Sequence, residues 1–103
     1  MKSLPSELTQ KVTVKINEVI EEETSRKLGE LNVITEVSET PDGNFRIQFS
    51  PLSPCSPLAV NMGRGIRDAG MSVDGVKHVT VECSGHMQDE LVNKLVNREK
   101  SPT

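Results

Sequence analysis

The chain has 103 residues, 34% of them hydrophobic, so we expect a single small domain over residues 1–103, with frayed ends at about residues 1–5 and 99–103. The formal net charge of −3 leaves no broad basic surface for a phosphate backbone, and two Phe with no Trp or Tyr supply few rings for stacking on bases. Both features argue against nucleic-acid binding. Apolar runs stay well short of the roughly 20 residues of a membrane span and no signal-peptide core is present, so we expect a cytoplasmic protein without a membrane partner.

The first predicted element is an amphipathic helix from Glu7 to about Glu23, whose apolar residues recur at spacings of three and four. It would end on three consecutive glutamates, Glu21 to Glu23, which crowd the negative end of a helix dipole. Either the helix stops sooner or this acidic run has another role. The simpler interpretation is a solvated run of charge.

Two strands joined by a hairpin are predicted next. The run from Leu31 to Ser38 is rich in β-branched residues, and the run from Phe45 to Ser50 alternates apolar and polar residues. Between them, Thr40 to Gly43 has the composition of a tight turn. We expect helices to cover the apolar side of the second strand, while the opposite sheet face is polar or forms a dimer contact.

Cys55 lies between the second predicted strand and a helical segment that opens at Leu58. Ser56 is a good N-cap and Pro57 suits the first helical position. Free amides and the helix dipole would then favour a thiolate at Cys55 and lower its pKa below the free value of about 8.5. Such a thiol suits a nucleophile, a redox centre or a metal ligand. The alternative is a small residue that fills a tight turn between two prolines.

The last predicted elements are a helix, a strand and a helix. The helix from Leu58 to about Gly70 contains Gly63 and Gly65, each costing about 1 kcal/mol relative to Ala, which indicates close packing or a bend. The strand extends from Val76 to Cys83, and the final helix from Gln88 to Arg98.

This order predicts an α+β fold: a two-layer αββαβ(α) domain, with a three-stranded mixed sheet and helices packed on one face. A right-handed crossover makes the third strand parallel to the second, so both strands end at the same edge of the sheet. Cys55, Cys83 and His86 would therefore meet at one rim. The simpler roles are a small core residue for Cys83 and a cap or surface residue for His86.

Three segments follow the pattern of a known family: the acidic run Glu21 to Glu23, the run Leu31 to Ile34, and the Gly-Val-x-x-Val-x-Val pattern from Gly75 to Val81. On these segments, residues 21–87 resemble the PaaD-like and SufT-like proteins of iron–sulfur assembly, the domain of unknown function 59 family. The resemblance implies an αββαβ fold and a role in maturing or delivering iron–sulfur clusters. It does not imply catalysis.

The sequence departs from that family at its Cys-Pro pair. Ser56 occupies the position of the family's cysteine and Cys55 lies one residue earlier, while Gly85 to Met87 replace a loop that contains Trp in many members. Through the resemblance, Glu21, Glu23 and Ser56 become functional candidates beside the predicted metal ligands.

The predicted ligands Cys55, Cys83 and His86 are too few for a closed four-ligand site, so a second chain or a client protein must supply the rest. We therefore expect a non-enzymatic carrier with no tightly bound cofactor, which handles iron or an iron–sulfur cluster transiently. Its partners would be iron–sulfur assembly proteins, client apo-proteins or a second copy in a homodimer. Two alternatives are a small thiol-redox protein that uses Cys55 and a protein-interaction module without cysteine chemistry.

Overall fold

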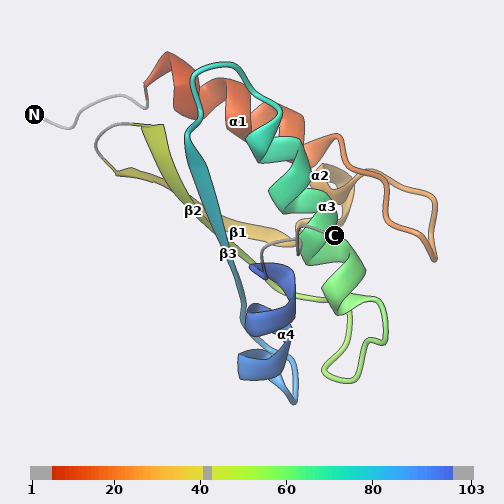
Figure 1. The fold of residues 1–103 in the computed structure, drawn as a ribbon. Coiled ribbons are helices and arrows are strands. Elements are labelled where there is room, and N and C mark those ends of the chain that lie inside the picture. Colours follow the sequence, from red (N-terminus) through yellow and green to blue (C-terminus); the bar gives the residue numbers. More distant parts are fainter. Residues whose placement is uncertain (1–5, 41–42, 99–103) are drawn as a thin grey trace, which may run out of the picture.

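The computed structural model describes residues 6–40 and 43–98, so the predicted frayed ends lie outside the described residues. Figure 1 shows the sheet with helices α1 and α3 on one side of it. The elements are α1 (Glu7–Asn17), α2 (Leu28–Leu31), β1 (Ile34–Thr40), β2 (Asn44–Phe49), α3 (Ala59–Met71), β3 (His78–Cys83) and α4 (Asp89–Val96). Within the described part of the chain, no helix has the length and apolar character to cross a membrane.

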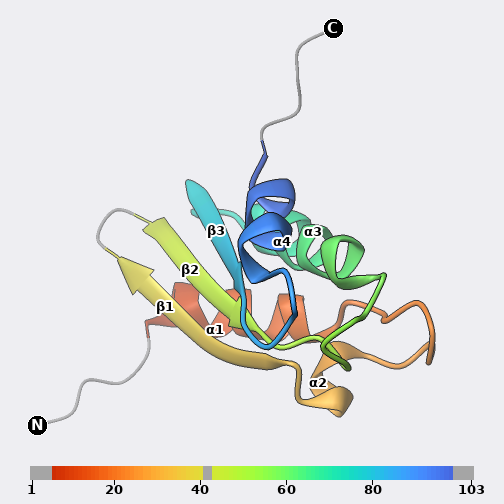
Figure 2. The same cartoon turned by 90° about the horizontal axis from the view of Figure 1, so that it is seen from below.

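The central strand of the three-stranded sheet is β2, which pairs antiparallel with β1 and parallel with β3. Helix α3 makes the crossover from β2 to β3. In Figure 2 the strands lie side by side, with α1 and α3 against one face and α4 next to β3. The predicted α+β class, the mixed sheet and the order of the main elements are confirmed.

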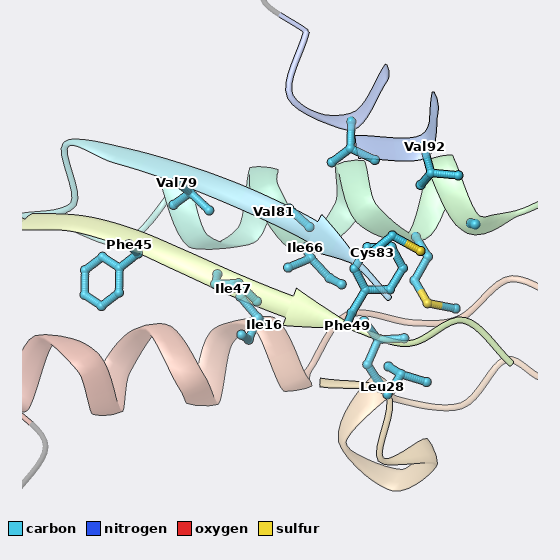
Figure 3. Close-up of a cluster of buried hydrophobic side chains, with 14 of the residues drawn as sticks. Ile16, Leu28, Phe45, Ile47, Phe49, Ile66, Val79, Val81, Cys83 and Val92 are labelled. Atoms are coloured by element: carbon cyan, nitrogen blue, oxygen red, sulfur yellow. The ribbon is translucent and has the colours of Figure 1, made fainter. Parts of the chain in front are cut away.

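Buried apolar residues alternate with more exposed residues along β2 and β3, and the buried ones form the centre of the hydrophobic core. The buried side chains of the two strands lie in register, and Figure 3 shows them packed between the sheet and the helices. The register pairs are Phe45 with Val79, Ile47 with Val81, and Phe49 with Cys83. Helices α1 and α3 cover these side chains with the buried residues Ile16, Met62 and Ile66, as the apolar spacing predicts.

The other face of the sheet is polar. Arg46 on β2 forms a salt bridge of 2.5 Å with Glu82 on β3, and Gln48 donates a hydrogen bond of 3.2 Å to the same carboxylate. The Arg46 hydrogen bond holds the pKa of Glu82 below its ordinary value. Because both side chains are partly exposed, water screens this ion pair and its contribution to stability is small.

Helix α4 and its C-cap protect the outer edge of β3 with two asparagines one turn apart, Asn93 in the helix and Asn97 at the cap. The Asn97 side chain accepts a hydrogen bond from Val81 N (2.8 Å) and donates one to Val81 O (2.7 Å), as a neighbouring strand would. Asn93 accepts from Cys83 N at 2.5 Å. An open strand edge attracts other strands, and these side chains block pairing at the C-terminal half of β3.

The end of α1 differs from the prediction. The helix stops at Asn17, well before Glu23, and the chain turns back through an isolated antiparallel bridge between Ile20 and Lys27. Ser25, with a φ of 58°, is in the left-handed region within this turn. The helical spacing of apolar residues in α1 continues as far as Ile20. The glutamates that follow are unfavourable at the negative end of a helix dipole, so an earlier end of the helix is favoured.

Leu28–Leu31 forms the short helix α2 instead of the start of a strand. Leu28 is fully buried, which anchors α2 to the core. Asn32 then ends the helix with a left-handed φ of 55°, a conformation that Asn tolerates better than most residues. Strand β1 therefore begins at Ile34, three residues later than predicted.

Candidate functional site

Two loops leave the same edge of the sheet, as the crossover predicts. Residues 50–58 follow β2 and residues 84–88 follow β3. Because Phe49 and Cys83 are register partners in parallel strands, the loops start side by side. Ser84 N donates a hydrogen bond of 2.9 Å to Phe49 O and joins the loops at their base. We call the surface formed by these two loops the rim.

Further hydrogen bonds join the two loops on both sides of Cys55. Met87 N donates to Pro54 O at 2.8 Å, and the Nε2 atom of His86 donates to Ser56 O at 3.0 Å. The residues immediately before and after Cys55 are thus both tied to the opposite loop. The position of Cys55 is therefore set by one backbone and one side-chain hydrogen bond from a segment about 30 residues later in the chain.

The thiol of Cys55 points to a second sulfur atom. Cys55 Sγ donates a hydrogen bond of 3.1 Å to Met87 Sδ. Cys55 is exposed, and Met87 is 73% exposed. The rim therefore presents a thiol and a thioether in contact with each other and open to solvent. The sequence pattern around Met87 did not predict this contact with Cys55.

His86 acts as a clamp between the loops. A carbonyl oxygen can only accept, so the hydrogen bond to Ser56 O places the proton on Nε2. The Nδ1 atom accepts from Gln88 N at 3.0 Å. Both ring nitrogens are therefore engaged within the rim, and the imidazole would have to break one of these bonds to bind a metal.

Asp89 holds the His86 loop in shape, a role that the sequence did not reveal. Its carboxylate accepts hydrogen bonds from His86 N (2.8 Å) and Gly85 N (3.3 Å). The hydrogen bond from the His86 amide is the main cause that lowers the pKa of Asp89 below its ordinary value, so the carboxylate is ionised at neutral pH. Asp89 is also the first residue of α4, where a negative charge complements the helix dipole.

Cys83 ends β3 and belongs to the core, where Figure 3 shows it among buried hydrophobic side chains. Only 4% of its surface is exposed. Burial raises the pKa of its thiol to about 12, and the nearby Asp89 carboxylate adds to this shift. Cys83 is therefore protonated at neutral pH, in keeping with a small core residue. In the residues that the structure describes, no three His, Cys, Asp or Glu side chains are grouped so that they could hold a metal ion.

The predicted N-cap of the central helix was wrong by two residues. Helix α3 begins at Ala59 with Leu58 as its N-cap, and the Ser56 side chain accepts only a long bond of 3.3 Å from Leu58 N. Ser56 and Pro57 lie in the loop before the helix. Cys55 therefore lies a full turn before the helix, too far from its N-terminus for the free amides and the helix dipole to favour a thiolate as predicted. Exposure and the Met87 contact remain as the features that distinguish this thiol.

Glu21 has a structural role instead of forming part of a solvated run. Only 4% of its surface is exposed, and its carboxylate accepts hydrogen bonds from Glu23 N (2.9 Å) and Thr24 N (2.7 Å). The Glu23 amide is the main cause that lowers the pKa of Glu21 below its ordinary value. Glu21 thus organises the turn after α1, while Glu23 contributes its backbone amide to that turn and has an exposed side chain.

Comparisons with known proteins support the same fold. No protein-family model matches the sequence. An uncharacterised protein of Methanocaldococcus jannaschii is 24% identical over 71 residues, which are 69% of this chain and 75% of that protein. The crystal structure of a domain of unknown function, DUF59, from Bacillus anthracis is similar with a TM-score of 0.70 and 18% sequence identity, over 75% of this chain and 74% of the other. The chain therefore has the fold of a DUF59 domain.

Proposed function

We propose that this protein is a non-enzymatic accessory protein that carries or delivers iron–sulfur clusters or iron, as its resemblance to the PaaD-like and SufT-like proteins implies. Cys55 is the proposed ligand to the cargo. The protein would act in the cytoplasm, with iron–sulfur assembly proteins and client apo-proteins as its partners.

The observation that carries the proposal is an exposed thiol at the rim of a DUF59 fold. Cys55 lies in the loop between β2 and α3, the place where the resembling family has its cysteine, although one residue earlier. Iron–sulfur clusters are held by cysteine thiolates, and an exposed thiol gives a cluster and a client protein direct access. The hydrogen bonds that join the two loops on both sides of Cys55 would hold the thiol in position for cluster exchange.

The proposed cargo site is shared between proteins. Of the three predicted ligands, Cys55 is the accessible one, because Cys83 is buried and protonated and both ring nitrogens of His86 are hydrogen-bonded within the rim. A cluster bound with four ligands needs donors from a client, from small thiols or from a second copy of this chain. Incomplete ligation in one chain suits a protein that hands its cargo on.

Anaerobic reconstitution with iron and sulfide tests the proposal. Absorption spectra and iron and sulfide counts would be compared for wild type, Cys55→Ser and Cys83→Ala. We expect cluster absorption in wild type and in Cys83→Ala, and its loss in Cys55→Ser. Equal loading of wild type and Cys55→Ser would remove Cys55 from the function.

The same experiment separates the two alternative functions. If no variant binds iron but Cys55 exchanges rapidly with small disulfides, a thiol-redox function replaces the carrier function. If Cys55 is inert in both assays, a protein-interaction module without cysteine chemistry is the better description. The exposed apolar residues Met87 and Leu91 at and beside the rim are the surface that such a module would use.

A further inference from the structure

We propose that Cys55 and Met87 form a binding site for a soft monovalent metal ion, with Cu(I) as the ion that fits best. The observation is the 3.1 Å contact between Cys55 Sγ and Met87 Sδ on an exposed surface. Two soft sulfur donors, one anionic when deprotonated and one neutral, meet there without a competing hard ligand between them.

The loops bring these donors together before any ion binds. Met87 N is bonded to Pro54 O at 2.8 Å, so the backbone beside each sulfur is joined to the backbone beside the other. The His86–Ser56 hydrogen bond of 3.0 Å holds the second side of Cys55. Asp89 fixes the His86 loop from below through two backbone amides. The backbone that carries the two sulfur donors therefore loses little freedom when an ion enters, and only the side chains must adjust.

Hydrophobic packing does not account for the position of Met87. With 73% of its surface exposed, the side chain is largely in water, yet its sulfur contacts the thiol. Methionine has three rotatable bonds, so the thioether can swing away from the thiol far enough to admit an ion between the two sulfurs.

The donor set selects the metal. Thiolate and thioether ligands favour Cu(I), whereas carboxylate and carbonyl oxygens favour harder ions such as Mg²⁺ and Ca²⁺. Binding replaces the thiol proton: the Cys55 S–H bond breaks, a sulfur–copper bond forms and the proton passes to solvent, with no change in oxidation state. One cation then replaces one proton, so the net charge of the rim is unchanged.

This inference shares Cys55 with the proposed function but does not depend on it. Iron–sulfur ligation uses the thiolate, while the thioether of Met87 is needed only by the soft-metal site. Met87→Leu removes the thioether and keeps a side chain of similar volume. The variant therefore separates the two roles.

The test is an anaerobic competition titration in which the protein takes Cu(I) from its bicinchoninate complex. We expect wild type to bind one Cu(I) per chain, Cys55→Ser to lose binding, and Met87→Leu to bind about tenfold more weakly or worse, since even groups behind metal ligands contribute about 10–100-fold. Met71→Leu is the matched control, because Met71 is also exposed but lies at the far end of α3. X-ray absorption of the wild-type complex should show two sulfur neighbours of copper.

Three results would overturn the site. Met87→Leu could bind as tightly as wild type, Met71→Leu could weaken binding equally, or wild type could bind no better than Cys55→Ser. Iron–sulfur reconstitution of Met87→Leu keeps this failure apart from that of the proposed function. If Met87→Leu loads the cluster normally but loses Cu(I), both assignments are supported. If it loads neither the cluster nor Cu(I), the claim that Met87 is needed only for copper is refuted.

Discussion

Gly63 is the position where helix propensity and packing predict opposite effects of one substitution. Gly63 is buried in α3, facing α4 and the sheet. A Cβ atom there would lie 2.6 Å from Val96 Cγ2 and 3.2 Å from Phe49 Cε1. Gly63→Ala therefore forces α4 or the Val96 side chain to move, although Ala is the better helix former.

The two effects can be weighed. Replacing Gly by Ala within a helix contributes about 1 kcal/mol of stability, and overpacking a core costs about 1–3 kcal/mol. A contact of 2.6 Å is at the severe end, so we expect Gly63→Ala to lower the free energy of unfolding by about 1–2 kcal/mol. At Gly65 the nearest atom to a Cβ is Val19 Cγ1 at 3.3 Å. Gly65→Ala should therefore range from neutral to about 1 kcal/mol more stable.

Urea unfolding followed by circular dichroism measures both variants, and a loss of 1 kcal/mol corresponds to about 4–8 °C in Tm for a domain of this size. The double variant Gly63→Ala/Val96→Ala removes the obstructing methyl groups. Its loss should be smaller than the sum of the losses of the two single variants. A Gly63→Ala protein as stable as wild type, or more so, would refute the packing of α4 against α3.

Three further predictions concern single side chains. In native protein at neutral pH, iodoacetamide should label Cys55 readily and Cys83 only after denaturation, because Cys83 is buried and its pKa is raised to about 12; faster labelling of Cys83 would contradict its placement. Glu21 has a lowered pKa in the folded protein, so its carboxylate stabilises the fold at pH values above its ordinary pKa, and this contribution is lost as the pH falls through the lowered value. Glu21→Gln should therefore be less stable than wild type to urea at about pH 7. If the stability difference between the two proteins is the same at about pH 3, the charge of Glu21 does not cause it. Asn97→Ala leaves the outward backbone groups of Val81 to water and should cost about 1–2 kcal/mol with faster amide exchange at Val81, and unaltered exchange would argue against the edge cap.

The fold was predictable because its strongest patterns are local. The alternation from Phe45 to Phe49 and the apolar stripe of α3 each set one face of an element, and a right-handed crossover then leaves few arrangements. The boundaries were less predictable. Ile20 fits the helical spacing of apolar residues in α1, but it forms a β-bridge with Lys27 instead. Helical spacing alone does not reveal such a tertiary contact. Likewise Asn32 stops α2 through its own backbone conformation.

The candidate site was predictable only at the level of loops. Topology correctly brought the Cys55 loop and the His86 loop to one edge, but it could not say which side chains meet there. The contact of Cys55 with Met87 joins residues 32 positions apart, and neither residue belongs to a local motif that marks the pair. Asp89 looked like an ordinary first residue of a helix, although its carboxylate also holds the His86 loop.

Cluster transfer tests the central claim, that Cys55 at the rim carries iron–sulfur cargo for delivery. Reconstituted wild-type protein would be mixed anaerobically with an apo-ferredoxin, and the holo-ferredoxin formed would be followed by circular dichroism. A Cys55→Ser sample with the same iron and sulfide content serves as the control. We predict transfer from wild type at a rate above that of free iron and sulfide, and no such acceleration from Cys55→Ser. Equal rates for the two samples would contradict the account.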